Sequence, residues 1–275
     1  MSTFLMKFNN SSEFDINEKI PNVVYLGGDS TPEFKNDYNS YDRRDGSIFS
    51  SSKIDSVTFT ANFYLKAKDY IAQKLLRHEL YQLFFGDREL IRIRTNIDFQ
   101  KVMYVRPKSF EIQNHSVGVN DSIFSIDLEI PGGYKYSMSR SDLISIDDIS
   151  FGMNFKLNEK PEFTHSEMSF RIYNPSDISI DPYYQRHDLI IRVNAQGPYY
   201  LISNKTNGTE YKYNKELKKT DSLILTGLTT ILNNNTDSIN SNFGYIKLEK
   251  GWNDIVISGA VSHTTTFSFP FLYID

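Results

Sequence analysis

The sequence predicts a mainly β protein of two domains: an α+β first domain with one helix, then a second domain that is a β-sandwich. Three observations support this prediction. The chain contains 20 Phe and 18 Tyr, residues that favour pleated, half-buried surfaces. A single segment, residues 67–85, has apolar residues at helical spacing. Beyond about residue 150, short apolar runs recur between turn residues, as they do in sandwiches.

Length, charge and composition restrict the classes of function. A chain of 275 residues can form two domains of ordinary size. Its formal net charge of -4 excludes a general attraction to DNA or to anionic membranes. It contains no Cys, so disulfides, thiol catalysis and thiolate metal sites are absent. We expect no membrane span and no signal peptide, and therefore synthesis in the cytoplasm without export.

Strands are expected on both sides of the helix in the first domain. In residues 57–65, apolar residues alternate with Thr and Asn, the period of a half-buried strand. Residues 29–47 are polar and contain Asp45-Gly46, so we expect a loop with a tight turn before that strand. The other strands are expected at residues 23–26, 90–94, 101–105, 109–112 and 122–130.

The helix predicted at residues 67–85 has one apolar stripe. The stripe consists of Ala72, Leu75, Leu76, Leu80, Leu83 and Phe84. A stripe of this width indicates a helix that packs on a sheet, and nothing in it suggests a cofactor. Gly86 is a candidate C-terminal cap. We expect Leu83 to face the sheet, so that a charge at this position would destabilise the domain.

The sequence Pro131-Gly132-Gly133 marks the best domain boundary. We therefore expect a first domain at residues 1–138 and a second at residues 139–275. Short strands separated by turns predict a sandwich in the second domain. These strands are expected at residues 151–157, 168–173, 189–193, 199–203, 222–225, 245–248, 255–258 and 266–272.

No catalytic constellation is recognisable in the sequence. No two of the five histidines are four residues apart, and no His-Glu-x-x-His motif occurs. Phosphate-binding glycine motifs and the Gly-x-Ser-x-Gly motif are also missing. Pairs of carboxylates are expected in any chain with 34 acidic residues, so they carry no information about glycosidase chemistry. We therefore expect a protein that is not an enzyme and that has no cofactor and no metal site.

Residues 88–108 form a basic segment with six Lys and Arg residues. Arg92 and Arg94 lie on one face of a predicted strand, because residues two apart in a strand point the same way. This face could contact nucleic acid. It could equally contact an acidic surface of a neighbouring subunit, which suits a chain that is otherwise net negative.

Trp252 is the only tryptophan and follows Gly251 at a turn. An exposed Trp often provides a stacking face for a sugar, so Trp252 is a possible weak glycan contact. The simpler interpretation is that the ring packs at the turn or lines a subunit contact.

The order of these features resembles the distal tail protein (Dit) family of siphophages. The first half of the resemblance is the series Asp45-Gly46-Ser47, strand 57–65, helix 67–85, strands 90–94 and 101–105, and Tyr134-Lys135-Tyr136-Ser137. The second half is carried by Tyr173-Asn174-Pro175-Ser176, Asp181-Pro182 and the run from Gly251 through Asn253 to Ile255, although a glycine of the family pattern is missing near Asn174.

This resemblance implies a structural role at the tail tip, or baseplate, of a virion. The first half would be a belt domain whose copies form a hexameric ring around the DNA channel, with Arg92 and Arg94 as possible ring-interface residues. The ring would join the tail tube protein to a tail-tip or tail-associated protein, and DNA would pass through only as cargo. The second half would be a galectin-like β-sandwich that serves as an attachment point for receptor-binding proteins.

Two other functions compete with this one. The chain could be a carbohydrate-binding or receptor-binding tail component that acts through the sandwich and Trp252. It could also be a tail-associated hydrolase, but the missing catalytic constellation leads us to expect no turnover of cell wall.

Overall fold

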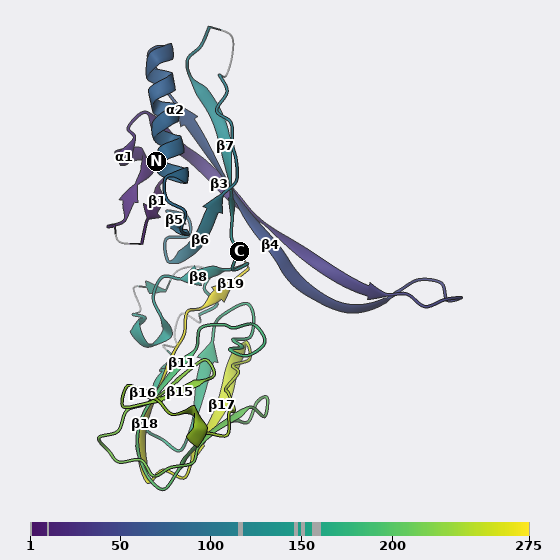
Figure 1. Cartoon of the computed structure of the whole chain (residues 1–275), viewed down its shortest axis with the longest axis vertical. Coiled ribbons are helices and arrows are strands. Elements are labelled where there is room, and N and C mark those ends of the chain that lie inside the picture. The colour runs from purple at the N-terminus through teal and green to yellow at the C-terminus, as the bar shows by residue number, and fades with distance from the viewer. Residues whose placement is uncertain are drawn as a thin grey trace. The chain divides into compact units, whose positions relative to one another are not determined.

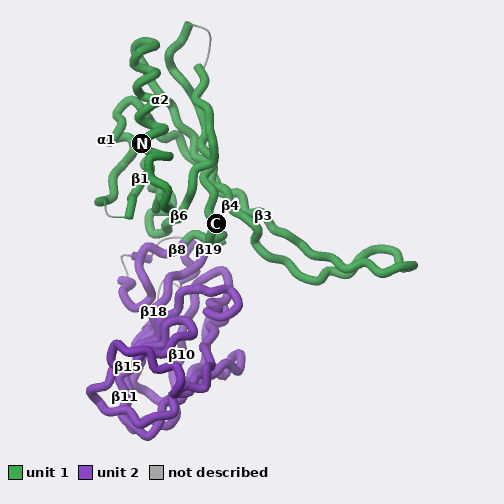
Figure 2. Tube along the Cα trace, in the orientation of Figure 1, with its two compact units in different colours: residues 1–135, 274–275 green, residues 136–273 purple. Residues whose placement is uncertain are grey.

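The computed structural model describes residues 2–9, 11–114, 118–145, 148–149, 152–155 and 161–274. The chain divides into two compact units, which Figure 2 shows in different colours. Unit 1 is Met1–Lys135 with Ile274–Asp275, and unit 2 is Tyr136–Tyr273. Strands dominate both units, so the predicted mainly β class is confirmed.

Unit 1 is built on an antiparallel sheet with the strand order β2-β1-β5-β6-β7-β4-β3. The bounds are β1 Phe4–Lys7, β2 Phe14–Asp15, β3 Val23–Asn39, β4 Ile48–Leu65, β5 Ile91–Thr95, β6 Lys101–Pro107 and β7 Ser122–Glu129. In β7, buried and exposed residues alternate strictly, which is the pattern that predicted this strand. The sheet therefore has one face turned to the core and one turned to solvent.

Helix α2 (Tyr70–Phe85) covers the core face of this sheet. It begins after Asp69, whose carboxylate accepts the main-chain N–H of Ala72 at 2.7 Å. The buried residues of the helix are Gln73, Leu76, Leu80 and Phe84. The prediction that Leu75 also lies under the helix was wrong, because the buried stripe is narrow and Leu75 is 60% exposed. A short helix, α1 (Ile16–Lys19), was not predicted.

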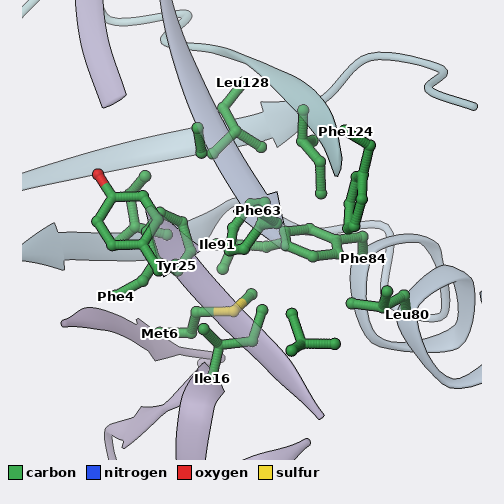
Figure 3. Close-up of a cluster of buried hydrophobic side chains, with 14 of the residues drawn as sticks. Phe4, Met6, Ile16, Tyr25, Phe63, Leu80, Phe84, Ile91, Phe124 and Leu128 are labelled. Atoms are coloured by element: carbon green, nitrogen blue, oxygen red, sulfur yellow. The ribbon is translucent and has the colours of Figure 1, made fainter. Parts of the chain in front are cut away.

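Phe63 is at the centre of the unit 1 core (Figure 3). Its ring lies 5.5 Å from that of Phe4, 5.6 Å from those of Tyr25 and Phe124, and 6.4 Å from that of Phe84. These rings come from four strands and from α2. Each fully buried aromatic side chain contributes roughly 1.5–3 kcal/mol, so this cluster ties the helix to the sheet.

The prediction of a loop at residues 29–47 was wrong, because most of this segment belongs to a long hairpin. Strands β3 and β4 pair from Val23 with Leu65 to Asn39 with Ile48, and the pairing is interrupted by three irregularities. Figure 1 shows the hairpin extending away from the rest of unit 1. We call its outer part, residues 33–54, the arm. Backbone pairing alone keeps the arm in strand conformation, so its residues lack the apolar alternation of a buried strand.

Two other segments expected to be strands are not. Residues 109–112 are not in a strand, and residues 245–248 make only an isolated bridge between Leu248 and Ile180. The strand expected at 151–157 lies partly outside the described residues, and residues 152–155 form no strand.

Unit 2 contains a four-stranded sheet, β10-β17-β12-β13, and a six-stranded sheet, β16-β15-β14-β11-β18-β9. The hydroxyl of Tyr200 on β12 lies 2.7 Å from that of Thr265 on β18, and the hydroxyl of Tyr211 on β13 lies 2.9 Å from that of Thr230 on β15. Buried side chains of the two sheets thus meet, as in a sandwich. The bounds are β8 Lys135–Ser137, β9 Thr164–His165, β10 Ser169–Asn174, β11 Ile190–Gln196, β12 Tyr200–Asn204, β13 Glu210–Tyr213, β14 Leu223–Thr226, β15 Thr229–Leu232, β16 Asn235–Thr236, β17 Gly251–Ser258, β18 Ser262–Ser268 and β19 Leu272–Tyr273, with 3₁₀ turns at Ser141–Leu143 and Ser238–Asn240.

Candidate assembly and binding surfaces

The arm has one aromatic face and one polar face. Pairing places Phe34 opposite Ile54 and Tyr38 opposite Phe49. Cross-strand partners lie on the same face of a hairpin, and Phe34 and Tyr38 are an even number of residues apart, so these four side chains share one face. We call them the aromatic face of the arm. The rings of Tyr38 and Phe49 lie 6.0 Å apart.

The opposite face of the arm carries polar and charged residues. Lys35 pairs with Lys53, and Asp37 pairs with Ser51, whose hydroxyl donates to the Asp37 carboxylate at 3.2 Å. This contrast makes the arm amphipathic although it is solvent-exposed on both faces. Such a pattern is unfavourable for a hairpin that stays in water on both sides.

The aromatic face is open to solvent in this chain. Phe34, Tyr38 and Phe49 are 52%, 58% and 56% exposed. Monomeric proteins seldom keep contiguous apolar patches open unless a partner covers them. In addition, β3 ends the strand order, so one edge of this 17-residue strand is unpaired within the described part of the chain. Both features are typical of an element that docks on another molecule.

Arg92 and Arg94 lie side by side on β5, as the sequence predicted, but both contact Glu13 of the same chain. Arg92 Nη2 lies 2.9 Å from Glu13 Oε1. Arg94 Nε donates to the two carboxylate oxygens at 3.0 and 3.1 Å, and its Nη2 also pairs with Oε2. The Arg94 guanidinium lies 3.9 Å from the centre of the Phe99 ring. Arg94 is almost fully buried.

The pKa of Glu13 reflects these contacts. Partial burial acts to raise the pKa, but the hydrogen bonds and charges of Arg94 and Arg92 outweigh it, so the pKa lies below its ordinary value. Glu13 is ionised at neutral pH and opposes one of the two positive charges. A role for Arg92 and Arg94 at a ring interface remains a prediction.

Other cations of the basic segment also have partners within unit 1. Arg106 Nη1 donates to the main-chain oxygens of Asp87 at 2.8 Å and Glu89 at 2.6 Å. Lys101 lies 3.8 Å from the carboxylate of Asp98, and Lys108 lies 3.6 Å from that of Glu129. The segment is therefore much less available to nucleic acid than its composition indicates.

Trp252 lies on β17 beside Tyr173 of β10. The two rings are 5.0 Å apart, and the guanidinium of Arg171 lies 4.7 Å from the centre of the Trp252 ring. Trp252 is partly buried. Because Arg171 covers one face of the indole, a sugar that stacked there would have to displace this cation–π contact.

A hollow of about 550 Å³ lies in unit 1 beside the C-terminal half of α2. Leu83 lines this hollow. It packs against the hydrophobic core but stays partly exposed, so it faces the sheet less completely than expected. The lining residues are Phe8, Lys19, Ile20, Glu79, Gln82, Leu83 and Asp87. Within the described ranges, no group of three His, Asp or Glu residues is arranged to hold a metal ion.

None of the described helices is long and apolar enough to cross a membrane.

Comparison with known proteins gives this architecture a context. Residues 10–122 match the phage tail protein RIFT-related domain. The chain is similar to the Dit protein of phage SPP1, with a TM-score of 0.68 and 10% sequence identity over 98% of this chain and 99% of that one. It is also similar to a chain of the phage p2 baseplate in its activated conformation with Sr, with a TM-score of 0.45 and 9% identity over 98% of both chains. No curated protein sequence matches.

The family match defines the class of the first part of this molecule: residues 10–122 match a domain of phage tail proteins. Within that class, its fold is that of a siphophage distal tail (Dit) protein. The resemblance drawn from the sequence is thereby confirmed. The arm lies entirely within the matched segment, residues 10–122, so it is part of the tail domain itself.

Proposed function

We propose that six copies of this chain form a closed ring at the tip of the phage tail. The ring joins the tail tube to the tail-tip proteins and leaves a central channel through which DNA passes as cargo. The number six and the neighbouring proteins follow from the resemblance to distal tail proteins. The observation that carries the proposal is the arm, a long hairpin on which the rings of Phe34, Tyr38 and Phe49 are open to solvent.

In the ring, the aromatic face of each arm lies on unit 1 of the next copy. Each copy then gives one arm and receives one, a head-to-tail contact that closes into a ring if the rotation between copies permits. Burying the three exposed rings, Phe34, Tyr38 and Phe49, contributes roughly 1.5–3 kcal/mol each before the cost of association. The long unpaired edge of β3 supports the same arrangement, because assembly covers edges that a monomer leaves open.

Unit 2 has a different role in this proposal. As a galectin-like sandwich it projects from the ring and serves as an attachment point for receptor-binding proteins. Its exposed loops and its separation from unit 1 as a compact unit support this assignment.

The absence of Cys permits a direct test of the arm contact. Asn36 lies between Phe34 and Tyr38 on the aromatic face, whereas Lys35 lies on the polar face. A photo-crosslinker attached to Asn36→Cys should join neighbouring copies into a ladder that ends at six, in purified protein and in tail particles. The same reagent on Lys35→Cys should give much less crosslinking. Equal crosslinking at both positions, or none at Asn36→Cys in tail particles, would reject the contact.

The alternative function is glycan binding through Trp252 on unit 2. Its support is the partial exposure of the indole on the outer side of the four-stranded sheet. It requires that glycan binding is lost in Trp252→Ala, and the cover provided by Arg171 makes it the weaker of the two proposals.

A further inference from the structure

Three tyrosines, Tyr183, Tyr184 and Tyr245, gather on the surface of unit 2. Tyr183 stacks on Tyr245, with ring centres 5.2 Å apart and ring planes 25° apart. Tyr184 meets Tyr183 edge to face at 4.7 Å. Tyr183 is 49% exposed and Tyr184 is 75% exposed. We call these three residues the tyrosine cluster.

The loop that carries Tyr183 and Tyr184 is held rigidly by its two ends. One carboxylate oxygen of Asp181 accepts the main-chain N–H groups of both tyrosines at 2.9 Å. The N–H of Asp181 donates to Nδ1 of His187 at 3.2 Å, and the N–H of His187 donates to the carbonyl of Asp181 at 3.0 Å. The main chain that carries the rings is therefore fixed before any ligand arrives, which lowers the entropic cost of binding.

A group of polar side chains that contact one another follows Tyr245 in the chain. Lys247 follows Tyr245 by two residues and its Nζ lies 2.9 Å from Glu249 Oε1. The side chain of Asn207 donates to the same carboxylate oxygen at 3.2 Å. These groups offer a cation, a carboxylate and an amide, which are the partners that hydroxyl groups of a ligand need.

The charges around the cluster balance. Asp181 and Arg186 belong to the loop that carries Tyr183 and Tyr184, and Lys247 and Glu249 follow Tyr245 in the chain, so each segment contributes one negative and one positive charge. A site with two of each sign has no net preference for an anion or a cation. It therefore suits an uncharged ligand with many hydroxyl groups.

The size of the cluster decides between a sugar and a protein as the ligand. An aromatic side chain presents roughly 200 Å² when fully exposed, so Tyr183 and Tyr184 together offer roughly 250 Å² at their exposed fractions. A stable protein interface needs about 800 Å² from each partner. The cluster is too small for that, but it matches one or two sugar rings.

We propose that the tyrosine cluster is a binding site for a neutral saccharide. The sugar lies with its apolar C–H face on the ring of Tyr184 and turns its hydroxyl groups to Lys247 and Glu249. This site is separate from ring assembly, which uses the arm of unit 1. It also differs from the alternative at Trp252, where Arg171 already covers one face of the ring.

The test uses the full-length protein and saturation-transfer NMR with cellobiose, lactose, maltose and diacetylchitobiose, together with an array of bacterial surface glycans. We expect at least one neutral glycan to bind with a Kd of about 1 mM. Tyr184→Ala should weaken this binding roughly three- to tenfold, because the stacking face is lost. Trp252→Ala should leave it unchanged, and so should Tyr41→Ala at an exposed tyrosine of unit 1.

Three outcomes would overturn the proposal. No binding to any glycan would remove the site, and binding only to phosphorylated or acidic glycans would contradict its neutral character. Loss of binding in Trp252→Ala but not in Tyr184→Ala would place the sugar on the indole. Thermal melting of each variant separates loss of binding from loss of fold, and Tyr184 is exposed enough for its removal to leave the fold intact.

Discussion

The carboxylate of Glu13 binds the guanidinium of Arg94 through both of its oxygens, although the two residues are 81 positions apart in the chain. Arg92 contacts the same carboxylate. Reversing the charges of both arginines would therefore leave three carboxylates together in a partly buried place. Such a variant would lose stability within one chain, so it cannot by itself report on ring assembly.

A charge swap separates the two effects. The triple variant Glu13→Arg, Arg92→Glu, Arg94→Glu keeps opposite charges in contact while reversing the net charge of the cluster. If the arginines face an acidic surface of the next copy, this variant should stay folded but form fewer rings, as judged by light scattering and negative-stain microscopy. Rings in normal yield would show that the arginines serve only their own chain.

Glu13→Gln should lower the free energy of unfolding by about 1–3 kcal/mol at neutral pH, because a charged hydrogen bond becomes a neutral one. The pKa of Glu13 lies below 4.5 in the folded state. The stabilisation by a carboxylate with a lowered pKa is complete above its unfolded value and is lost as the pH falls through the folded value. Urea unfolding should therefore show a gap between wild type and variant that narrows below pH 4.5. A gap that persists in acid would contradict the ionic origin. Glu79→Gln, on the exposed side of α2, is the control.

Leu80→Ala and Leu75→Ala test the orientation of α2. Leu80 is fully buried and Leu75 is 60% exposed. Leu80→Ala should cost about 2–5 kcal/mol, because it leaves a cavity under the helix. Leu75→Ala should change stability by less than about 0.5 kcal/mol. Urea unfolding of both variants gives the comparison, and similar losses for the two would mean that the helix is rotated.

His187 makes the loop between Asp181 and His187, which carries Tyr183 and Tyr184, sensitive to acid. Burial lowers the pKa of His187, although a main-chain hydrogen bond at Ser179 and the charge of Asp181 act in the opposite direction. Nδ1 can accept the N–H of Asp181 only while the imidazole is neutral. The stabilisation is therefore complete above about pH 6.5, the unfolded value, and is lost as the pH falls through the lowered folded value.

Hydrogen exchange measures this loosening. The amides of Tyr183 and Tyr184 should lose protection when His187 becomes protonated, while the amides of β17 keep theirs. An NMR titration of the His187 ring on the same sample gives the pKa. Protection at Tyr183 and Tyr184 that does not change across the titration would show that the histidine does not hold the loop.

Tyr200→Phe tests the contact between the two sheets of unit 2. The Tyr200 hydroxyl is fully buried, burial raises its pKa, and it lies 2.7 Å from the hydroxyl of Thr265. Thr265 keeps its contact with His263 Nδ1 at 2.9 Å, so the loss should be near 1 kcal/mol. The neighbouring Tyr199→Phe, at a partly exposed ring, should be close to neutral. Thermal unfolding that ranks the two variants in the reverse order would exclude this contact as a stabilising one.

The predictions were correct for elements that bury one face, because burial of one face requires apolar residues at regular spacing in the sequence. Strand β7 and helix α2 were found because each packs one face on a core, and residues 57–65 for the same reason. The arm could not be predicted in this way. Its strands are held by main-chain pairing, so its sequence shows no regular alternation of apolar residues. The opposite error occurred at residues 109–112 and 245–248, which were predicted to be strands. Their alternating apolar residues pack against the core, but no strand pairs with these segments.

The candidate sites were less predictable, because they depend on residues distant in the chain. Nothing near Arg94 in the sequence points to Glu13, and nothing near Trp252 points to Arg171. The only local sign of the tyrosine cluster is the pair Tyr183-Tyr184 after Asp181-Pro182, and the third ring comes from a separate loop.

The chain enters unit 2 at Tyr136 and leaves it at Tyr273, and the strands at these two points, β8 and β19, pair with each other (Figure 1). The N–H of Ser137 donates to the carbonyl of Phe271 at 2.9 Å. This hydrogen bond joins the first and the last strand segments of unit 2. The beginning and the end of unit 2 therefore lie side by side. A replacement needs only two adjacent ends to fit, so recombination could exchange the whole unit while the tail domain stays unchanged.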